Sequence, residues 1–253
     1  MELLTPTKAI ILGLVQGITE FLPVSSSAHL ALAQNLLGAK EIPLVFDIFL
    51  HLATLFAVLM VLDKKVIAIL KNPMANAKTI KIVASATAIT AVLGYLLASK
   101  ISLFFSNLTL VGILLLINSL ILAINHPKFP KISLTKGRGI WLGLAQSLAL
   151  IPGISRSGTT ITTARASGFK PQEAFEISFL LYLPAVAGAL VLESVRAPLA
   201  FYQVNAVPIA VGFFTAFISG WGTLKVLQSI LQKGKLWIFA PYCIVLGLLL
   251  LFF

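Results

Sequence analysis

The chain has 253 residues, of which 58% are hydrophobic and only 11% are charged, and its mean hydropathy is +1.01. Soluble domains average roughly 25% charged residues, and a chain this apolar lacks the polar surface that a soluble protein needs, which excludes that class. The formal charge is +11, but no basic face with interleaved aromatic residues appears, so we expect no nucleic-acid partner. The single cysteine, Cys243, excludes an intrachain disulfide and a cysteine-based metal site. We therefore expect an all-α integral membrane protein.

The first apolar stretch, residues 9–22, has 14 residues and ends at Pro23, which three serines follow closely. A helix of this length is too short to cross about 30 Å of hydrocarbon, and a proline stops it. We expect a re-entrant helix-turn-helix hairpin, because irregular backbone at membrane depth is tolerable only where protein or a water-filled cavity surrounds it. A second such stretch, residues 139–151, ends in the same way at Pro152.

Six other apolar stretches are long enough, or nearly so, to cross the membrane as helices. Three of them follow the first hairpin and three follow the second. They are residues 44–62, 82–98, 108–124, 174–192, 206–224 and 236–252. The sequence therefore predicts six transmembrane helices plus two re-entrant hairpins in a single membrane domain, residues 1–253.

The two halves of the chain resemble each other. Residues 12–16 (LGLVQ) recur 130 positions later as residues 142–146 (LGLAQ), and the serines 25–27 match Ser-Arg-Ser at the same offset. Because three spans, an odd number, follow each hairpin, the second copy must enter the membrane from the opposite side. This predicts an inverted-topology repeat, with repeat one at about 1–125 and repeat two at about 138–253.

The basic residues predict which side of the membrane each loop faces. Fourteen lysines and arginines fall in four loops, residues 63–81, 125–138, 165–173 and 225–235. The opposite side holds four, Lys8, Lys40, Lys100 and Arg196. Since inner loops carry the excess of positive charge, we expect the first hairpin to enter from outside and the second from inside.

The first hairpin carries polar side chains that are costly at membrane depth. Gln16 and Glu20 are four residues apart and share one face of a helix, and a carboxylate at this depth is usually functional. The serines 25–27 supply hydroxyls in the turn, and one of them could cap the next helix, whose N-terminus favours an anion. His29 lies on that next helix, within reach of the turn, although such a histidine is as often a packing residue.

The second hairpin places Arg156 at a similar depth. An arginine there needs an anionic partner, and its planar fork suits phosphate oxygens. Further hydrogen-bond donors and a position of close backbone approach surround it: Ser155, Ser157, Gly158 and Thr159. The structural alternative is that Glu20 and Arg156 pair with each other and do nothing more. For Asp47, His51 and Glu176 we favour a role in lining or bracing a cavity over a catalytic one.

At these hairpins the sequence resembles the undecaprenyl-diphosphate phosphatase (bacitracin-resistance) family of bacteria. One signature, a Glu or Gln followed by Gly, a hydrophobe, Thr-Glu-Phe-Leu-Pro, a hydrophobe, Ser-Ser and then His, is matched by residues 16–29. The other, Pro-Gly-hydrophobe-Ser-Arg-Ser-Gly, is matched by residues 152–158. The resemblance covers essentially the whole chain. It implies six spans, two re-entrant hairpins and a cavity open to the outer side of the bacterial inner (plasma) membrane.

The activity that the resemblance implies is removal of the terminal phosphate from a C55 isoprenyl diphosphate, which recycles the lipid carrier of cell-wall synthesis. It implies catalytic roles for Glu20, Ser26, His29 and Arg156. Substrate contacts are expected at the neighbouring positions Ser25, Ser27, Ser155, Ser157, Gly158 and Thr159. It also implies a divalent cation, Mg²⁺ or Ca²⁺, held by Glu20 and Gln16. Many members carry Glu at position 16, and the amide of Gln16 offers an oxygen but no charge, so a two-carboxylate metal site lacks its second charge here.

The implied reaction is phosphoryl transfer, in which Arg156 and the donors of the hairpins offset charge on the phosphate. Ser26 attacks the terminal phosphorus or positions a water, and His29, with an unperturbed pKa of about 6.5, acts as acid or base. Serine, histidine and water all stay open as the nucleophile.

The rival function is a secondary transporter or lipid flippase, because inverted repeats with broken helices are typical of transporters. The bilayer and the lipid substrate are the expected partners, and a homodimer stays open.

Overall fold

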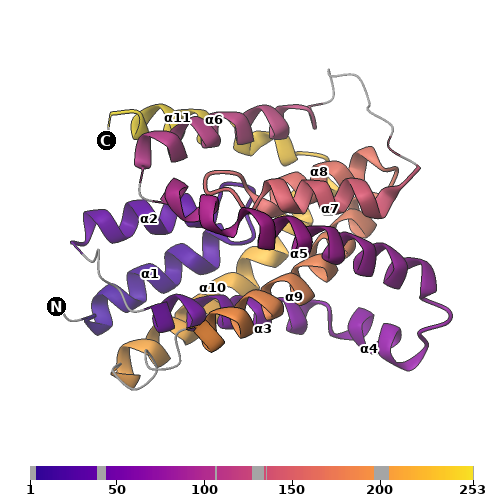
Figure 1. The fold of residues 1–253 in the computed structure, drawn as a ribbon, viewed down its shortest axis with the longest axis horizontal. Helices are drawn as coiled ribbons and strands as arrows, with labels where there is room; N and C mark the ends of the chain where they lie inside the picture. Colours follow the sequence, from indigo (N-terminus) through magenta and orange to yellow (C-terminus); the bar gives the residue numbers. More distant parts are fainter. Residues whose placement is uncertain are drawn as a thin grey trace.

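The computed structural model describes residues 4–38, 44–105, 107–126, 134, 136–196 and 205–252. The described residues form helices connected by short loops and turns, with no strand among them (Figure 1). The helices of the first half are α1 (Pro6–Thr19), α2 (Ser26–Leu36), α3 (Leu44–Val61), α4 (Asp63–Lys71), α5 (Ala77–Phe105) and α6 (Leu108–Ala123). Those of the second half are α7 (Arg138–Leu148), α8 (Arg156–Ala166), α9 (Pro171–Arg196), α10 (Ala206–Gln232), the 3₁₀ turn η2 (Leu236–Ile238) and α11 (Phe239–Leu250).

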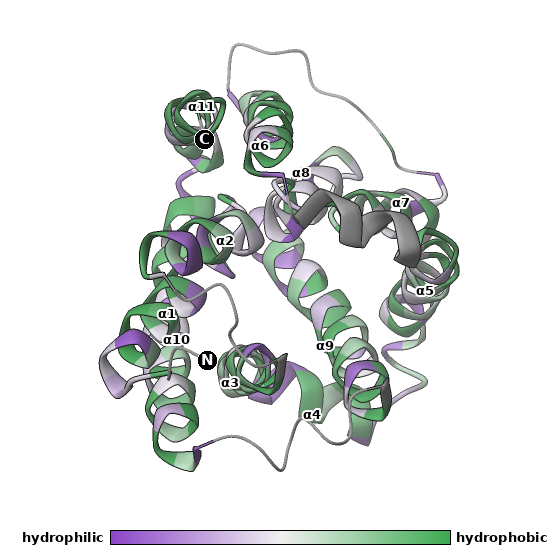
Figure 2. Cartoon of the chain, turned by 60° about the vertical axis from the view of Figure 1, so that its left-hand side comes forward, coloured by the Kyte–Doolittle hydropathy of each residue, from purple (hydrophilic) through white to green (hydrophobic). Residues whose placement is uncertain are grey.

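Three of these helices, α5, α9 and α10, are long and apolar enough to cross a membrane. Helices α6 and α11 are apolar but shorter. Figure 2 shows hydrophobic residues along the outward faces of α5, α6 and α11, as expected where lipid covers the protein. The chain is thus an all-α, multi-pass membrane protein, as the composition predicts.

The span expected at residues 44–62 ends one residue early and does not continue straight. Helix α3 stops at Val61, and α4 leaves it at an angle of 74°. The bend comes where Asp63, Lys64 and Lys65 begin, since three consecutive charges are costly in hydrocarbon. Lys40 and most of the loop 125–138 lie outside the described residues, so the structure gives no position for these parts of the expected charge pattern.

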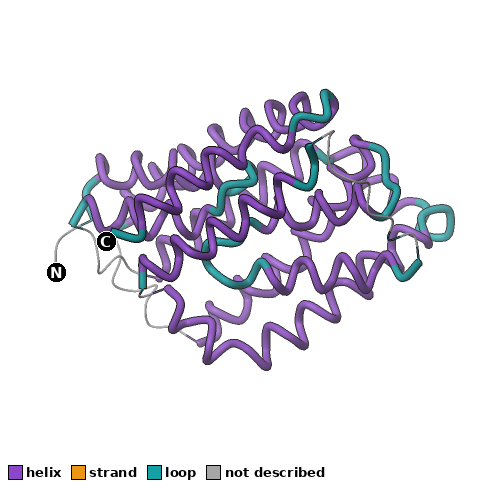
Figure 3. Tube along the Cα trace, turned by 90° about the horizontal axis from the view of Figure 1, so that it is seen from above, coloured by secondary structure: helices purple, strands orange, loops and turns teal. Residues whose placement is uncertain are grey.

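The two short apolar stretches form paired helices, α1 with α2 and α7 with α8, joined by irregular turns. Figure 3 shows loop segments inside the helical body as well as at its ends. In the first turn Ser25 has a φ of +70°, a conformation that non-glycine residues rarely adopt. In the second turn Gly153 has a φ of +96° and fits it without a Cβ. Strain held at Ser25 is a common feature of functional sites.

Each hairpin packs closely on one long helix of the opposite half. A Cβ added at Gly13 of α1 would lie 2.6 Å from the carbonyl oxygen of Gly212 on α10. The repeat counterpart, Gly143 of α7, meets Ala86 of α5, where the added Cβ would lie 3.0 Å from the carbonyl oxygen. Only glycine permits this approach. The packing fixes both hairpins against the core of the protein.

Candidate active site

The turns of the two hairpins meet in the interior of the molecule. The hydroxyl of Ser25 accepts a hydrogen bond from the backbone N–H of Gly153, with a distance of 3.1 Å. Asn118 of α6 joins both turns, because its amide nitrogen donates to the Pro23 carbonyl and its amide oxygen accepts from the Ser155 N–H, each at 3.0 Å. Asn118 is completely buried. Asn118 was not among the site residues predicted from the sequence, although an asparagine inside an apolar stretch could have indicated it.

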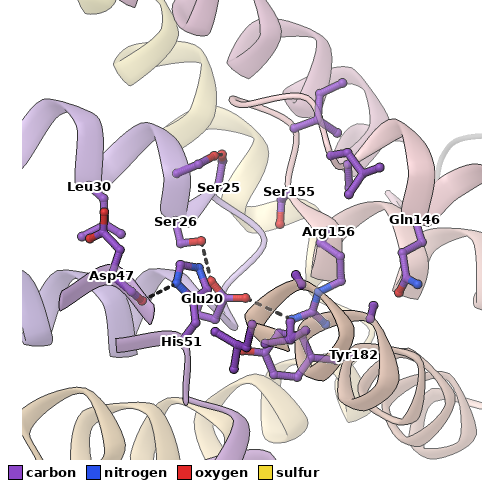
Figure 4. Close-up of a pocket in the computed structure, with 18 of the residues that line it drawn as sticks. Glu20, Ser25, Ser26, Leu30, Asp47, His51, Gln146, Ser155, Arg156 and Tyr182 are labelled. Carbon is purple, nitrogen blue, oxygen red and sulfur yellow. Dashed lines mark hydrogen bonds and ion pairs between the residues drawn. The ribbon is translucent and has the colours of Figure 1, made fainter. Parts of the chain in front are cut away.

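A cavity of about 540 Å³ opens beside these turns, and α3, α5 and α9 complete its walls (Figure 4). Its polar lining includes Glu20 from the first hairpin and Arg156 from the second. Leu150, Ile154 and Leu190 contribute apolar surface. The cavity therefore combines charged groups with an apolar wall, as a site for an amphiphilic molecule requires.

Glu20 lies at the centre of a hydrogen-bond network. The Ser26 hydroxyl donates to its Oε2 at 2.6 Å, and the Gln16 amide nitrogen donates to the same oxygen at 3.2 Å. Arg156 Nη2 donates to Oε1 at 3.3 Å. The Glu20 side chain is only 8% exposed, so these contacts are made largely out of water. A carboxylate that already accepts the hydroxyl proton of a serine is placed to remove it.

Arg156 keeps part of its hydrogen-bonding capacity free. Its Nη1 is buried and has no hydrogen-bond partner among the described residues. The guanidinium carbon lies 4.1 Å from the centre of the Tyr182 ring and 5.2 Å from that of Phe179, so the fork is stacked on aromatic surface. The Tyr182 hydroxyl is in turn hydrogen-bonded to Thr54 Oγ1 at 2.9 Å. A buried, unpaired guanidinium nitrogen is costly unless an acceptor arrives, and phosphate oxygens match its geometry.

Two helix N-termini also face the cavity. Helix α2 begins at Ser26 and α8 begins at Arg156, and both residues line the cavity. Ser25, at the N-cap position of α2, makes no side-chain capping bond, whereas the Ser155 hydroxyl caps α8 by accepting from the Gly158 N–H at 3.1 Å. The partial positive charge of a helix N-terminus favours an anion. The two N-termini and Arg156 together define an anion site.

Several residues expected at the substrate do not line the cavity. The Ser157 hydroxyl is hydrogen-bonded to the Ser155 hydroxyl and to the Leu22 carbonyl, and Thr159 Oγ1 donates to the carbonyls of Ser155 and Arg156. A Cβ on Gly158 would meet Leu122 and Pro23 at 3.2 Å. These three residues hold the turn together, because their groups point into the packing between hairpins. Ser25, Ser27 and Ser155 do line the cavity.

His29 faces away from the cavity. Its ring stacks on Tyr242 of α11, with 5.6 Å between centroids and 8° between planes. Nδ1 lies 2.8 Å from the Ser25 carbonyl oxygen and Nε2 lies 2.6 Å from the Tyr242 hydroxyl. Ser26 and His29 are three residues apart on α2, and of the two only Ser26 lines the cavity. The structure thus brings Glu20, Ser26 and Arg156 together but leaves His29 apart from them.

The cavity contains a histidine of a different helix. His51 and Asp47 of α3 both line it, which agrees with the lining role expected for them. Glu176, their expected companion, instead forms an ion pair with Lys65 at 3.2 Å. Gln146, the repeat counterpart of Gln16, also lines the cavity, and its buried Oε1 has no hydrogen-bond partner among the described residues. The repeated LGLxQ motif was the signal that could have pointed to it.

The protein oxygens can supply part of a divalent cation site. Among the described residues no three His, Cys, Asp or Glu side chains come close enough to hold a metal by themselves. The Gln16 Oε1 is buried with no hydrogen-bond partner in the described part of the chain, and the Gln16 amide nitrogen contacts the Glu20 carboxylate. Mg²⁺ is usually held by one or two carboxylates together with substrate phosphates. Glu20 and Gln16 fit a cation of that kind, which would neutralise charge on the phosphates.

Fold and site define a polytopic helical membrane protein with a buried anion site in which a serine, a carboxylate and an arginine converge. Comparison with known sequences identifies the family to which the chain belongs. Residues 9–249 match the family described as Bacitracin resistance protein BacA, and the chain belongs to this family.

Curated relatives cover almost the whole chain. A protein of Elusimicrobium minutum is 40% identical over 255 residues, covering 98% of each chain. Proteins of Carboxydothermus hydrogenoformans and Desulfosudis oleivorans are 39% and 38% identical, and each alignment covers 96% of this chain and at least 95% of the relative. All three relatives are named undecaprenyl-diphosphatase.

Proposed function

We propose that this protein is a membrane phosphatase that hydrolyses undecaprenyl diphosphate to undecaprenyl phosphate and inorganic phosphate. The observation that carries the proposal is the contact between Ser26 and Glu20 at 2.6 Å, beside an Arg156 nitrogen to which no described residue is hydrogen-bonded. Such a site can hold a phosphate and transfer it. The full-length similarity to proteins named undecaprenyl-diphosphatase supports this substrate. Release of the lipid monophosphate recycles the carrier of cell-wall synthesis.

The first chemical step follows from the geometry. Ser26 Oγ attacks the terminal phosphorus while Glu20 accepts the hydroxyl proton across their hydrogen bond. The bond from phosphorus to the bridging oxygen breaks, and undecaprenyl phosphate leaves with the electron pair. Arg156 Nη1 and the N-termini of α2 and α8 stabilise charge on the equatorial oxygens. Serine, histidine and water were the candidate nucleophiles, and we favour Ser26 because its hydroxyl already contacts a proton acceptor, the Glu20 carboxylate.

The same cavity suits the two ends of the lipid. Its polar side holds the diphosphate, and the apolar wall formed by Ala149, Leu150 and Leu190 receives the first isoprenyl units. A C55 chain is far longer than this wall, so the remainder extends along the apolar outer surface into the bilayer. A divalent cation, Mg²⁺ or Ca²⁺, bound between the diphosphate and Glu20 would supply further positive charge.

For the membrane arrangement we propose six spans, made by α3, α5, α6, α9, α10 and α11, and two re-entrant hairpins related as an inverted repeat. The corresponding contacts of Gly13 with α10 and Gly143 with α5 support the repeat. The excess of lysine and arginine in the expected inner loops supports an active site that opens to the outer side of the bacterial inner membrane. The substrate would then be dephosphorylated on the side where cell-wall synthesis releases it.

Phosphate release by purified protein in detergent tests the proposal. C55 isoprenyl diphosphate is the substrate, with chelator or added Mg²⁺ in parallel arms. Catalysis needs no second compartment, whereas the rival transporter or flippase function does. Equal release of inorganic phosphate and lipid monophosphate supports a phosphatase. Movement of lipid across vesicles without hydrolysis would support the transporter instead.

A further inference from the structure

The chain's three histidines all lie within the described residues, and of these His51 alone lines the cavity. His126 lies just beyond the end of α6, with its ring 4.7 Å from the ring of Trp237 between centroids. His29 packs on Tyr242 and does not line the cavity that contains Glu20 and Ser26. Any histidine chemistry on a phosphate in this cavity therefore falls to His51.

The hydrogen bonds of the two rings define which nitrogen can accept a proton. His51 Nδ1 lies 2.9 Å from the backbone carbonyl oxygen of Asp47. A carbonyl oxygen only accepts, so Nδ1 carries the hydrogen and the lone pair of the neutral ring is on Nε2. No described residue is hydrogen-bonded to this Nε2. In His29, Nδ1 donates to the Ser25 carbonyl by the same argument, and the lone pair on Nε2 already accepts from the Tyr242 hydroxyl.

The position of His51 is held from both sides of the cavity. Its backbone carbonyl accepts a hydrogen bond from Thr54 Oγ1 at 2.9 Å, and Thr54 is bonded to the hydroxyl of Tyr182, on which Arg156 stacks. Asp47, one turn before, accepts from Gln34 of α2 at 3.4 Å. The segment that carries His51 is thus connected to the same groups that position the arginine, and Figure 4 shows His51 among the labelled side chains that line the cavity with Glu20 and Ser26.

The second half of the proposed reaction needs a proton acceptor that Glu20 cannot be. After the first step Glu20 carries the proton of Ser26. A water must then attack the phosphorus of phosphoserine, and the bond from phosphorus to Ser26 Oγ breaks. Glu20 returns its proton to that oxygen, so the proton lost by the water needs a different base. The charged groups that share the cavity with His51 are Glu20, Asp47, Arg156 and Glu193.

We infer that His51 is a catalytic residue of this site, the base that activates water to release phosphate from Ser26, and that His29 is a packing residue. The inference rests on the proposed phosphatase function. His51 Nε2 takes one proton from the attacking water, the water oxygen bonds to phosphorus, and Ser26 recovers its proton from Glu20. Inorganic phosphate leaves, and the imidazolium gives its proton to solvent in the cavity.

The test separates the two half-reactions. His51→Asn keeps an amide N–H near the place of Nδ1, where it can still donate to the Asp47 carbonyl, but removes the basic nitrogen. We expect one equivalent of undecaprenyl phosphate per protein in a rapid first phase, phosphate retained on Ser26, and a steady rate at least about a hundredfold below wild type. Mass spectrometry of the Ser26 peptide measures the retained phosphate. Imidazole added to His51→Ala should restore part of the steady rate, which a purely structural role would not allow.

A steady rate within twofold of wild type in His51→Asn overturns the inference, and so does a slow variant that retains no phosphate on Ser26. Should His51→Asn fail to fold in detergent, His51→Gln is measured in the same two assays and is judged by the same criteria. The double variant Ser26→Ala, His51→Asn controls for the site of phosphorylation and should retain none. Wild-type protein that releases no phosphate at all would contradict the proposed function, which is a different failure.

Discussion

At the residue scale, Arg156 contacts Glu20 with one guanidinium nitrogen and keeps a second nitrogen available for a phosphate oxygen. Nη2 contacts Glu20 at 3.3 Å, while Nη1 is buried without a partner among the described residues, and the guanidinium carbon lies 4.1 Å from the centre of the Tyr182 ring. A lysine would keep the charge but could not hold both positions or stack in the same way. The geometry of the guanidinium, more than its charge, therefore determines how the phosphate is held.

We expect Arg156→Lys to lower kcat/KM at least tenfold, which corresponds to about 1.4 kcal/mol of transition-state stabilisation. Steady-state release of phosphate from the lipid diphosphate measures this loss. Arg165→Lys is the matched control, because Arg165 is on the same helix but donates only to the exposed Phe169 carbonyl. Activity of Arg156→Lys within twofold of wild type would remove this arginine from the site.

Gln16 allows a test of the cation. Its Oε1 is buried and no described residue is hydrogen-bonded to it, while its amide nitrogen contacts Glu20. Hard cations prefer charged oxygen ligands. If a cation binds there, Gln16→Glu should lower the Mg²⁺ or Ca²⁺ concentration for half-maximal activity with little change in the saturated rate. Metal titration of the folded variant measures the shift. An unchanged half-maximal concentration would contradict a cation at this helix face, since the new carboxylate would then be only an uncompensated buried charge.

At the scale of elements, the connection between the hairpins depends on Asn118. Its amide satisfies the Pro23 carbonyl and the Ser155 N–H, both in irregular backbone. Asn118→Leu leaves the buried Ser155 N–H without a partner among the described residues, and leaves the Pro23 carbonyl only the weak contact from Cys243 Sγ at 3.7 Å. A buried group left unpaired costs about 1–3 kcal/mol. We expect a lower midpoint of thermal unfolding together with loss of activity. Asn125→Ala should have a much smaller effect, because Asn125 is only partly buried near the end of α6; an equal loss in both variants would contradict the linking role.

Local signals in the sequence predicted the elements well. Pro23 and Pro152 correctly indicated that each short helix ends in an irregular turn, but α1 stops at Thr19 and α7 at Leu148, three residues before the predicted ends. Of the serines and glycines near the prolines, Ser25 and Gly153 lie in the turns. The bend after Val61 was missed, although the charges at Asp63 and Lys64 were visible. The surroundings of His29 could not be predicted from the sequence, because they depend on its contact with Tyr242 of α11, 213 positions away, which arises only on packing. Contacts between residues over 90 positions apart, such as Asn118 with Pro23, likewise arise only on packing.

For the whole molecule, the proposed inverted repeat makes a claim about sidedness. Lys8 should face outside, while Lys71 and Lys233 should face inside. Single cysteines at these positions, in a Cys243→Ser background, report their side when intact cells are treated with a membrane-impermeant thiol reagent. Cys243 is fully buried, and its replacement removes background labelling. Labelling of position 71 or 233 from outside would contradict the proposed orientation and the outward-opening site.

The central claim is that the cavity shared by the two hairpins hydrolyses a lipid diphosphate by attack of Ser26. The most direct measurement compares phosphate release from C55 isoprenyl diphosphate by wild-type protein, Ser26→Ala and Ser85→Ala in detergent. Ser85 donates only to its own helix, at the Lys81 and Ile82 carbonyls, so its variant controls for loss of a serine hydroxyl. We expect wild type and Ser85→Ala to release phosphate equally and Ser26→Ala to be at least about a thousandfold slower. Equal release by all three proteins would contradict the account.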